Sequence, residues 1–191
     1  MVTLDNKKFV VDSLMKTGRE GMDGLIEYME DCGFFSAPCS GGFHLACEFG
    51  LVHHTRHVME YAEKIGVSLL GGEEYNKIHN SVTIAAALHD LGKMGQFEKP
   101  NYVLNVLKSG KPSDAKPFKT NPDLMYVDHE IRSVAIASMF IDLTEEEQFA
   151  ILYHNGMYGN LRYAFKDNET PLSMIIHWAD MWASRVIENK K

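Results

Sequence analysis

The histidines and aspartates of this chain carry its most distinctive chemistry. The sequence holds nine histidines in 191 residues, and one of them adjoins an aspartate in AAALHDLGK, as His89 and Asp90. An adjacent imidazole and carboxylate can bind one divalent cation together, because both are donors that Zn, Mn, Fe, Co or Mg accepts. Aspartate is seldom buried without a partner. A His-Asp pair at the end of an apolar stretch therefore indicates a metal site.

Further histidines and one more aspartate lie in apolar stretches on both sides of this pair. The upstream stretch GLVHHTRHV carries His53, His54 and His57. The downstream stretches carry His129, His154, His177 and Asp180. Helices that each contribute one inward side chain can build a metal site in the core of a bundle. The spacing of these residues predicts such a site.

The elements that must position these residues are predicted to be helices. Apolar residues recur with helical period over 5–31 (interrupted at Gly18 and Gly21), 45–66, 73–93, 129–140, 144–154 and 170–188. Gly66 is expected to end the second of these helices, with a turn over 69–72. Thr144 and Glu147 form a capping-box pattern at the start of another. The fold class is therefore predicted to be all-α.

Residues 95–127 depart from this helical pattern. They hold four of the six prolines, and the window 99–119 has five lysines against the single acid Asp114. The stretch NYVLNVLKSGKPSDAKPFKT resembles a strand, a turn at 108–111 and a second strand. Two interpretations stay open for this proline-rich insert. It is either a solvated loop or a cover that closes over a phosphate-bearing substrate.

Composition narrows the class of protein. Apolar residues make up 45% and charged residues 24% of the chain, as in ordinary globular proteins. The net charge of −7 does not suit the binding of long nucleic acid. No apolar run approaches about 18 residues, so no membrane span is expected. The N-terminus lacks the apolar core of a signal peptide, and three cysteines suggest reduced thiols, so a cytoplasmic location is expected.

In its motifs the sequence resembles the HD-domain superfamily of metal-dependent phosphohydrolases. The resemblance covers about 44–188 and rests on GLVHHTRHV, on HDLGK and on the closing Ala179-Asp180 pair. It is nearest to the dinuclear branch, which includes the HD modules of 3′–5′ exoribonucleases and the HD-GYP phosphodiesterases. This sequence shows no OB domain, and Asn-Gly-Met-Tyr-Gly follows His154 in place of the GYP signature. The resemblance implies an HD helical bundle over 44–191, preceded by a helical extension over 1–43.

The resemblance also implies the ligands of two divalent ions, drawn from Mn, Fe, Mg, Co, Ni and Zn. The first ion would be held by His54, His89, Asp90 and Asp180. His129 and His154 match the two extra histidines of the dinuclear branch and would hold the second ion, which Asp90 can share because it has two oxygens. In the alternative, the enzyme has one metal ion, and His129 and His154 bind phosphate.

Other side chains are expected to act on the substrate. Asp90 and Lys93 are the predicted catalytic residues. Lys93 stands four residues after His89 on the same helix face, where its ammonium group would hold a phosphate oxygen. His57 shares a face with His54 and would contact the substrate or a metal ligand. Arg132 and Arg162 are predicted phosphate-binding residues.

Some residues are expected to have only structural roles. His44 and His79 are predicted to lie on the surface or in packing. Cys32, Cys39, His44 and Cys47 fit no common zinc spacing. The pair Trp178 and Trp182 is predicted to lie in the core.

These features predict hydrolysis of a phosphate ester or phosphodiester by a metal-activated water. The expected partner is a small phosphorylated substrate, a nucleotide or a short single-stranded oligonucleotide. The alternative is an HD-type di-iron oxygenase that cleaves a C–C or C–P bond of a small organic substrate. Both types of enzyme use four histidines and two aspartates, so the ligand set does not separate them.

Overall fold

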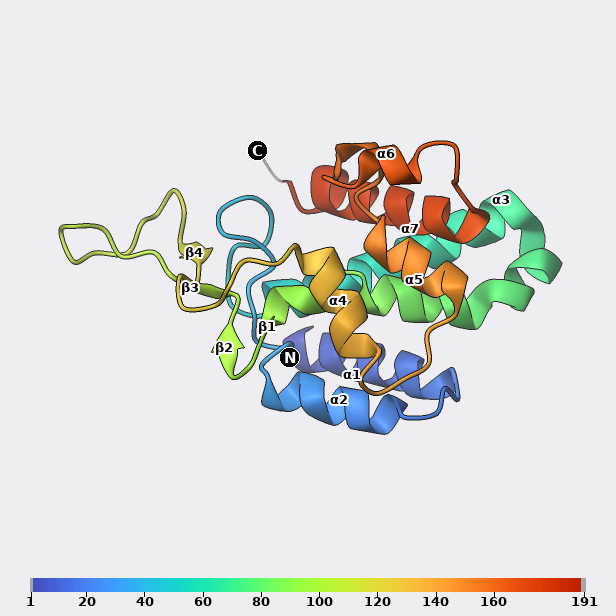
Figure 1. Cartoon of the computed structure of the whole chain (residues 1–191), viewed down its shortest axis with the longest axis horizontal. Helices are drawn as coiled ribbons and strands as arrows, with labels where there is room; N and C mark the ends of the chain where they lie inside the picture. The colour runs from blue at the N-terminus through green and yellow to red at the C-terminus, as the bar shows by residue number, and fades with distance from the viewer. Residues whose placement is uncertain (1, 190–191) are drawn as a thin grey trace.

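Helices make up most of the chain, as the sequence predicts, in a computed structural model that describes residues 2–189 (Figure 1). The α-helices are α1 (Val2–Lys16), α2 (Met22–Asp31), α3 (Gly50–Leu88), α4 (His129–Ala137), α5 (Glu145–Leu152), α6 (Arg162–Phe165) and α7 (Pro171–Trp182). Shorter helical turns are η1 (Leu91–Met94), η2 (Gly156–Tyr158) and the π-helix η3 (Ala183–Ile187). The fold is an all-α bundle, and α3 and α7 form its centre.

Helix α3 is a folded-back pair of helical segments, and its bend differs in place from the expected one. The helix starts at Gly50, after Phe49 adopts a positive φ of 64°, and it continues past Gly66. The break comes at Gly71, whose φ of 77° and ψ of 162° suit a glycine. Gly66 has another role, since a Cβ there would lie 2.5 Å from the ring of Tyr75 on the returning segment. The bend brings the two ends of α3 together.

The core lies between the returning segment of α3 and its neighbours. Ala85, Ala86, Ala87 and Leu88 are fully buried. Small side chains allow close helix packing, and the buried residues Ile176 and Ala179 of α7 belong to the same core. Among residues 2–189, none of the helices combines the length and the apolarity that crossing a bilayer would require.

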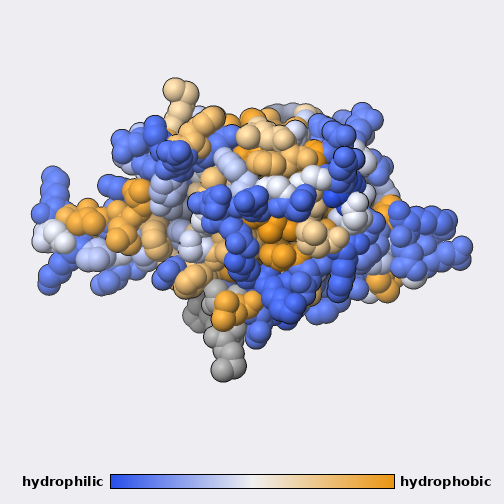
Figure 2. All heavy atoms as spheres, turned by 90° about the horizontal axis from the view of Figure 1, so that it is seen from below, coloured by the Kyte–Doolittle hydropathy of each residue, from blue (hydrophilic) through white to orange (hydrophobic). Residues whose placement is uncertain are grey.

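The insert contains the predicted hairpin. Strand β1 (Gly95–Gln96) pairs with β2 (Lys99–Pro100), and β3 (Tyr102–Leu104) pairs antiparallel with β4 (Phe118–Thr120). The tip is at the predicted turn, where the Leu107 amide donates to the Lys111 carbonyl and Gly110 has a positive φ. The β3–β4 arm projects from the bundle, and Figure 2 shows hydrophobic atoms between its hydrophilic tip and the body.

The C-terminal half carries one confirmed cap and one wrong prediction. Thr144 and Glu147 form the capping box, and the buried Glu147 carboxylate also pairs with Arg19. Trp178 and Trp182 do not lie in the core, as they are 39% and 49% exposed. The buried face of α7 is occupied by residues such as Ile175, Ile176 and Ala179, so the two indoles are on the opposite side.

The bend of α3 can be tested with a pair of glycine substitutions. We expect Gly66→Ala to lower the free energy of unfolding by about 1–3 kcal/mol, the usual cost of overpacking, because its methyl overlaps the buried Tyr75 ring. Gly72→Ala is the control, since a Cβ there meets nothing within 4 Å; we expect it to stabilise the helix by up to about 1 kcal/mol. Urea unfolding followed by circular dichroism measures both changes. Equal stability of the two variants would contradict the packing role of Gly66.

Candidate metal centre

Six side chains from distant parts of the chain meet in the centre of the bundle. They are His54, His89, Asp90, His129, His154 and Asp180, here called the His–Asp cluster. The two ends of α3 bring His54 and His89 within 3.2 Å of each other, although they are 35 residues apart in sequence. The structure thus assembles all six residues that the sequence predicts as metal ligands.

The carboxylate of Asp90 lies between two pairs of imidazoles. Its Oδ2 is 3.4 Å from Nε2 of His54 and 3.3 Å from Nε2 of His89. Its Oδ1 is 3.1 Å from Nε2 of His129 and 3.6 Å from Nε2 of His154. Asp180 adds an oxygen 3.2 Å from Nε2 of His54. A single carboxylate therefore faces one imidazole pair with each oxygen.

The four imidazoles share one orientation. Nδ1 of His89 and Nδ1 of His154 each lie 2.8 Å from the backbone carbonyl oxygen of the residue three positions earlier. A carbonyl only accepts, so Nδ1 carries the hydrogen and Nε2 keeps its lone pair. Nδ1 of His54 lies 3.0 Å from Glu188, and Nδ1 of His129 lies 3.3 Å from Glu130. Every Nε2 thus faces the centre of the cluster.

This arrangement fits a divalent cation. Nε2 atoms approach each other to 3.2 Å between His54 and His89 and to 3.4 Å between His129 and His154, so their lone pairs face each other. The buried Oδ1 of Asp90 has no hydrogen-bond partner among the described residues. Buried polar atoms nearly always have a partner. Imidazoles that use Nδ1 for an oxygen and point Nε2 inward are typical of metal ligands.

Lys93 places a positive charge beside the carboxylate of Asp90. Its Nζ lies 2.6 Å from Oδ2 of Asp90, and its side chain is 14% exposed. Burial alone would raise the pKa of Asp90, but the Lys93 ammonium and the neighbouring imidazoles hold it well below its usual value. Burial alone would lower the pKa of Lys93, but Asp90 holds it well above its usual value. Both groups are therefore charged at neutral pH.

Glu188 is a residue of this site that the sequence analysis missed. Its carboxylate, 1% exposed, contacts Nδ1 of three imidazoles, those of His44, His54 and His57. These hydrogen bonds hold its pKa far below the usual value, although burial opposes them. Glu188 directly follows the π-helix η3, which continues from α7. Such π-helical turns often occur at functional sites. No sequence signal marks it, because it stands in a polar Glu-Asn-Lys-Lys tail.

Glu188 also changes the interpretation of two histidines. His44, expected on the surface or in packing, lies beside the cluster, with its ring 4.8 Å from that of His54. Cys39 and Glu188 raise the pKa of His44 to about 9 against the opposing effect of burial. His57 contacts Glu188 at 2.8 Å.

The two arginines that are predicted to bind phosphate are engaged elsewhere. Arg132 is buried, and its guanidinium donates to the Gln96 side chain and to the Met125 carbonyl, both at 2.9 Å. Arg162 is exposed and stacks over the ring of its neighbour Tyr163. The structure thus places Arg132 at the base of the insert and Arg162 on the surface of α6.

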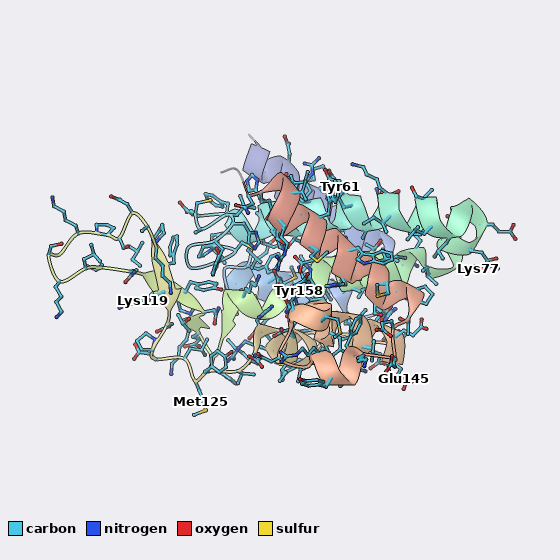
Figure 3. The ribbon with its side chains drawn as sticks, turned by 90° about the horizontal axis from the view of Figure 1, so that it is seen from above. Tyr61, Lys77, Lys119, Met125, Glu145 and Tyr158 are labelled. Atoms are coloured by element: carbon cyan, nitrogen blue, oxygen red, sulfur yellow. The ribbon has the colours of Figure 1, made fainter. Side chains whose placement is uncertain are left out.

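The position of His154 depends on close packing against His177. Gly156 has a φ of +53°, and a Cβ there would lie 2.6 Å from the His177 ring. Nδ1 of His177 donates to the His154 carbonyl at 2.8 Å. Tyr158 covers this pair from outside, beside α7 in Figure 3, with its ring 6.3 Å from that of His177. Gly156 therefore lets the turn that follows α5, which carries His154, pack directly against His177.

The metal-free protein is expected to lose stability on mild acidification. Burial and the neighbouring imidazoles of His89 and His129 lower the pKa of His154 from 6.5 to about 3. As the pH falls, His154 takes up a proton in the unfolded chain before it does so in the folded chain. The stability that is present above pH 6.5 is therefore lost as the pH falls toward 3, by about 1.4 kcal/mol per pH unit. Carboxylates such as Asp180 titrate in the unfolded chain only near pH 4. Burial also lowers the pKa of the partly exposed His53, but the larger shift of the buried His154 gives it most of this window.

The measurement is urea unfolding with a chelator at about pH 6 and about pH 4.5. Both pH values lie between the pKa of His154 in the unfolded chain and its pKa in the folded chain. We expect His154→Gln to flatten the loss of stability between these pH values. The exposed His79 supplies the control, since His79→Gln should keep the wild-type slope. An unchanged slope in His154→Gln would show that other groups control the acid sensitivity.

Comparison with known proteins assigns the chain to a family. A family model described as HD domain matches residues 51–183, which is more than half of the chain and contains all six residues of the His–Asp cluster. The comparisons with curated proteins and with solved structures gave no significant match. The matched segment and the His–Asp cluster together establish that the chain belongs to the HD domain family, whose general activity is metal-dependent phosphohydrolysis.

Proposed function

We propose that this protein hydrolyses a phosphate ester or phosphodiester of a nucleotide or short oligonucleotide, with two divalent cations in the His–Asp cluster. His54, His89, Asp90 and Asp180 would hold the first cation. His129 and His154 would hold the second together with Asp90. The observation that carries the proposal is the position of the Asp90 carboxylate, with an imidazole pair within 3.6 Å of each oxygen.

The cations would supply Lewis acidity, which polarises a phosphoryl oxygen and lowers the pKa of a water molecule. The chain itself supplies the orientation. Carbonyl oxygens behind His89 and His154, and Glu188 behind His54, keep each Nε2 directed inward. Because these contacts exist before any ligand binds, little reorganisation is needed during the reaction.

Burial identifies the side from which a substrate would enter. His54, His89 and Asp90 are at most 1% exposed, whereas the side chains of His129 and Asp180 are 27% and 17% exposed. A phosphate group would therefore reach the cluster past His129 and Asp180. Lys93, partly exposed beside Asp90, would hold one phosphate oxygen as a point charge.

His57 would act in this scheme through Glu188. The contact between these two side chains holds the carboxylate that orients His54. A role as a positioning residue explains the geometry of His57 better than direct contact with the substrate.

The function is tested by a hydrolysis assay with and without oxygen. We expect the purified chain to cleave bis(p-nitrophenyl) phosphate or a dinucleotide with Mn²⁺, to lose this activity with a chelator, and to keep it under anaerobic conditions. Asp90→Asn has nearly the same shape but lacks the charge, so it should lower kcat by at least about 100-fold, as expected for a lost metal ligand. Circular dichroism checks that the variant is folded.

The oxygenase alternative predicts the opposite pattern. If no phosphate ester is cleaved by the Mn²⁺-loaded chain, and the iron-loaded chain consumes oxygen with an organic substrate, the hydrolase proposal is wrong. Oxygen consumption separates the two activities because hydrolysis uses only water.

The number of cations is tested by metal analysis. We expect about two ions per chain in the wild type and about one in His154→Ala, because His129 and Asp90 alone form a weak second site, and activity should fall about 100-fold. His79→Ala, a change on the exposed side of α3, should keep both ions. One ion in the wild type would refute the two-metal proposal and would leave His129 and His154 free to bind phosphate.

A further inference from the structure

A hollow of about 330 Å³ lies between the 40–43 loop and the insert. Its lining includes Phe43, Tyr102, Lys116 and Thr120. A second hollow of about 200 Å³ shares Tyr102 and Thr120 and reaches His129. Tyr102 and Thr120 face each other across the β3–β4 pair. The two hollows are thus neighbours along this strand pair, and the second ends at the exposed edge of the cluster.

The 40–43 loop and the insert, which form the walls of the first hollow, are in direct contact with each other. The Phe118 amide donates to the Gly41 carbonyl at 3.1 Å. A Cβ on Gly41 would lie 2.9 Å from the Phe118 carbonyl oxygen, and one on Gly42 would lie 3.1 Å from Cγ of Lys116. The two glycines therefore let the loop lie directly against the lysine and the strand. Local sequence patterns do not indicate this contact, because it joins residues about 75 positions apart.

Lys116 places a free cation in this hollow. No carboxylate of the described residues lies within 4.0 Å of its ammonium group. The loop also touches the catalytic lysine, since Sγ of Cys39 lies 4.0 Å from Nζ of Lys93. Two lysines thus flank the loop, Lys93 at the cluster and Lys116 in the hollow. An unpaired ammonium group in a concave site suits a phosphate.

Aromatic surface completes the hollow. Phe43 is 95% exposed, yet its turn is fixed, because the Phe43 amide donates to Oγ of Ser40 and that hydroxyl donates to the His44 carbonyl. Tyr102 is half-buried, and no hydrogen bond among residues 2–189 uses its hydroxyl. Nucleic-acid bases stack on exposed aromatic rings, with about 1–3 kcal/mol per base. The fixed, exposed phenylalanine suits stacking with a base, and the free lysine beside it suits binding of a phosphate.

We infer that this hollow binds the nucleotide next to the scissile bond, with its base on Phe43 and its own phosphate on Lys116. The inference rests on the proposed hydrolase function and narrows its substrate to a terminally phosphorylated dinucleotide or a short oligonucleotide. Such a substrate has a phosphate beyond the one that is cleaved. A nucleoside monophosphate or a sugar phosphate lacks this second phosphate and would leave Lys116 unpaired.

The first test compares dinucleotides with and without a terminal phosphate, at the 5′ end in one series and the 3′ end in another. We expect the wild type to prefer one phosphorylated form by at least about tenfold in kcat/KM, the usual effect of a hydrogen bond to a charged group. Lys116→Ala should abolish this preference. Lys108→Ala is the matched control, because Lys108 is exposed on the same arm and does not line the hollow, and it should keep the preference.

Phe43→Ala tests the base. We expect KM for dinucleotides to rise about tenfold, as for a lost stacking contact. This exposed side chain can be removed without disturbing the core. If bis(p-nitrophenyl) phosphate is cleaved but neither variant differs from the wild type on dinucleotides, the hydrolase proposal stands and the subsite is refuted.

Calorimetric titration with the phosphorylated dinucleotide tests the subsite without catalysis. If nothing is hydrolysed, but the dinucleotide binds the wild type about tenfold more tightly than Phe43→Ala and Lys116→Ala, the subsite stands and the hydrolase proposal fails. Equal binding by all three proteins would overturn the subsite.

Discussion

The burial of the Asp90 carboxylate is the constraint on which the rest of this structure depends. An isolated buried charge is very costly, so it must be compensated by partners in the protein or by a bound cation. Lys93 compensates one oxygen at 2.6 Å, and imidazoles surround the other. Helices from most of the chain end or bend where they can supply these partners. The need to compensate this charge therefore links the bundle to its chemistry.

The backbone around His89 and Asp90 is held as firmly as the side chains. Oγ of Ser133, on α4, donates to the His89 carbonyl and accepts from the Gly92 amide. A Cβ on Gly92 would lie 2.3 Å from the His129 carbonyl oxygen, so only glycine lets α4 approach this closely. This approach brings His129 to the second oxygen of Asp90. Without it, the cluster would lack His129, and Oδ1 of Asp90 would face only His154.

The segment that leaves the cluster also shapes its surroundings. The chain passes from Lys93 directly into the insert and returns to the cluster at His129. The insert is thus anchored at both ends to the candidate metal centre. Strand β3 carries Tyr102, and the segment before β4 carries Lys116, and both side chains line the hollow beside the 40–43 loop. A long loop of this kind commonly adapts a shared scaffold to a particular ligand.

The sequence by itself determined the helical class, the hairpin tip, the Thr144 cap and the six residues of the His–Asp cluster. The first three features are encoded locally, by apolar periodicity and turn residues, and the six residues follow from motifs such as HDLGK that resemble the HD-domain superfamily. The sequence analysis did not find Glu188, the contact of His44 with it, the real role of Gly66 or the exposure of the two tryptophans. Each of these depends on which segments of the chain pack together. Glu188 meets His54 across 134 residues, and no local pattern records such a contact. Only the tertiary structure decided these features, because a buried contact between distant segments arises from the packing of the whole bundle.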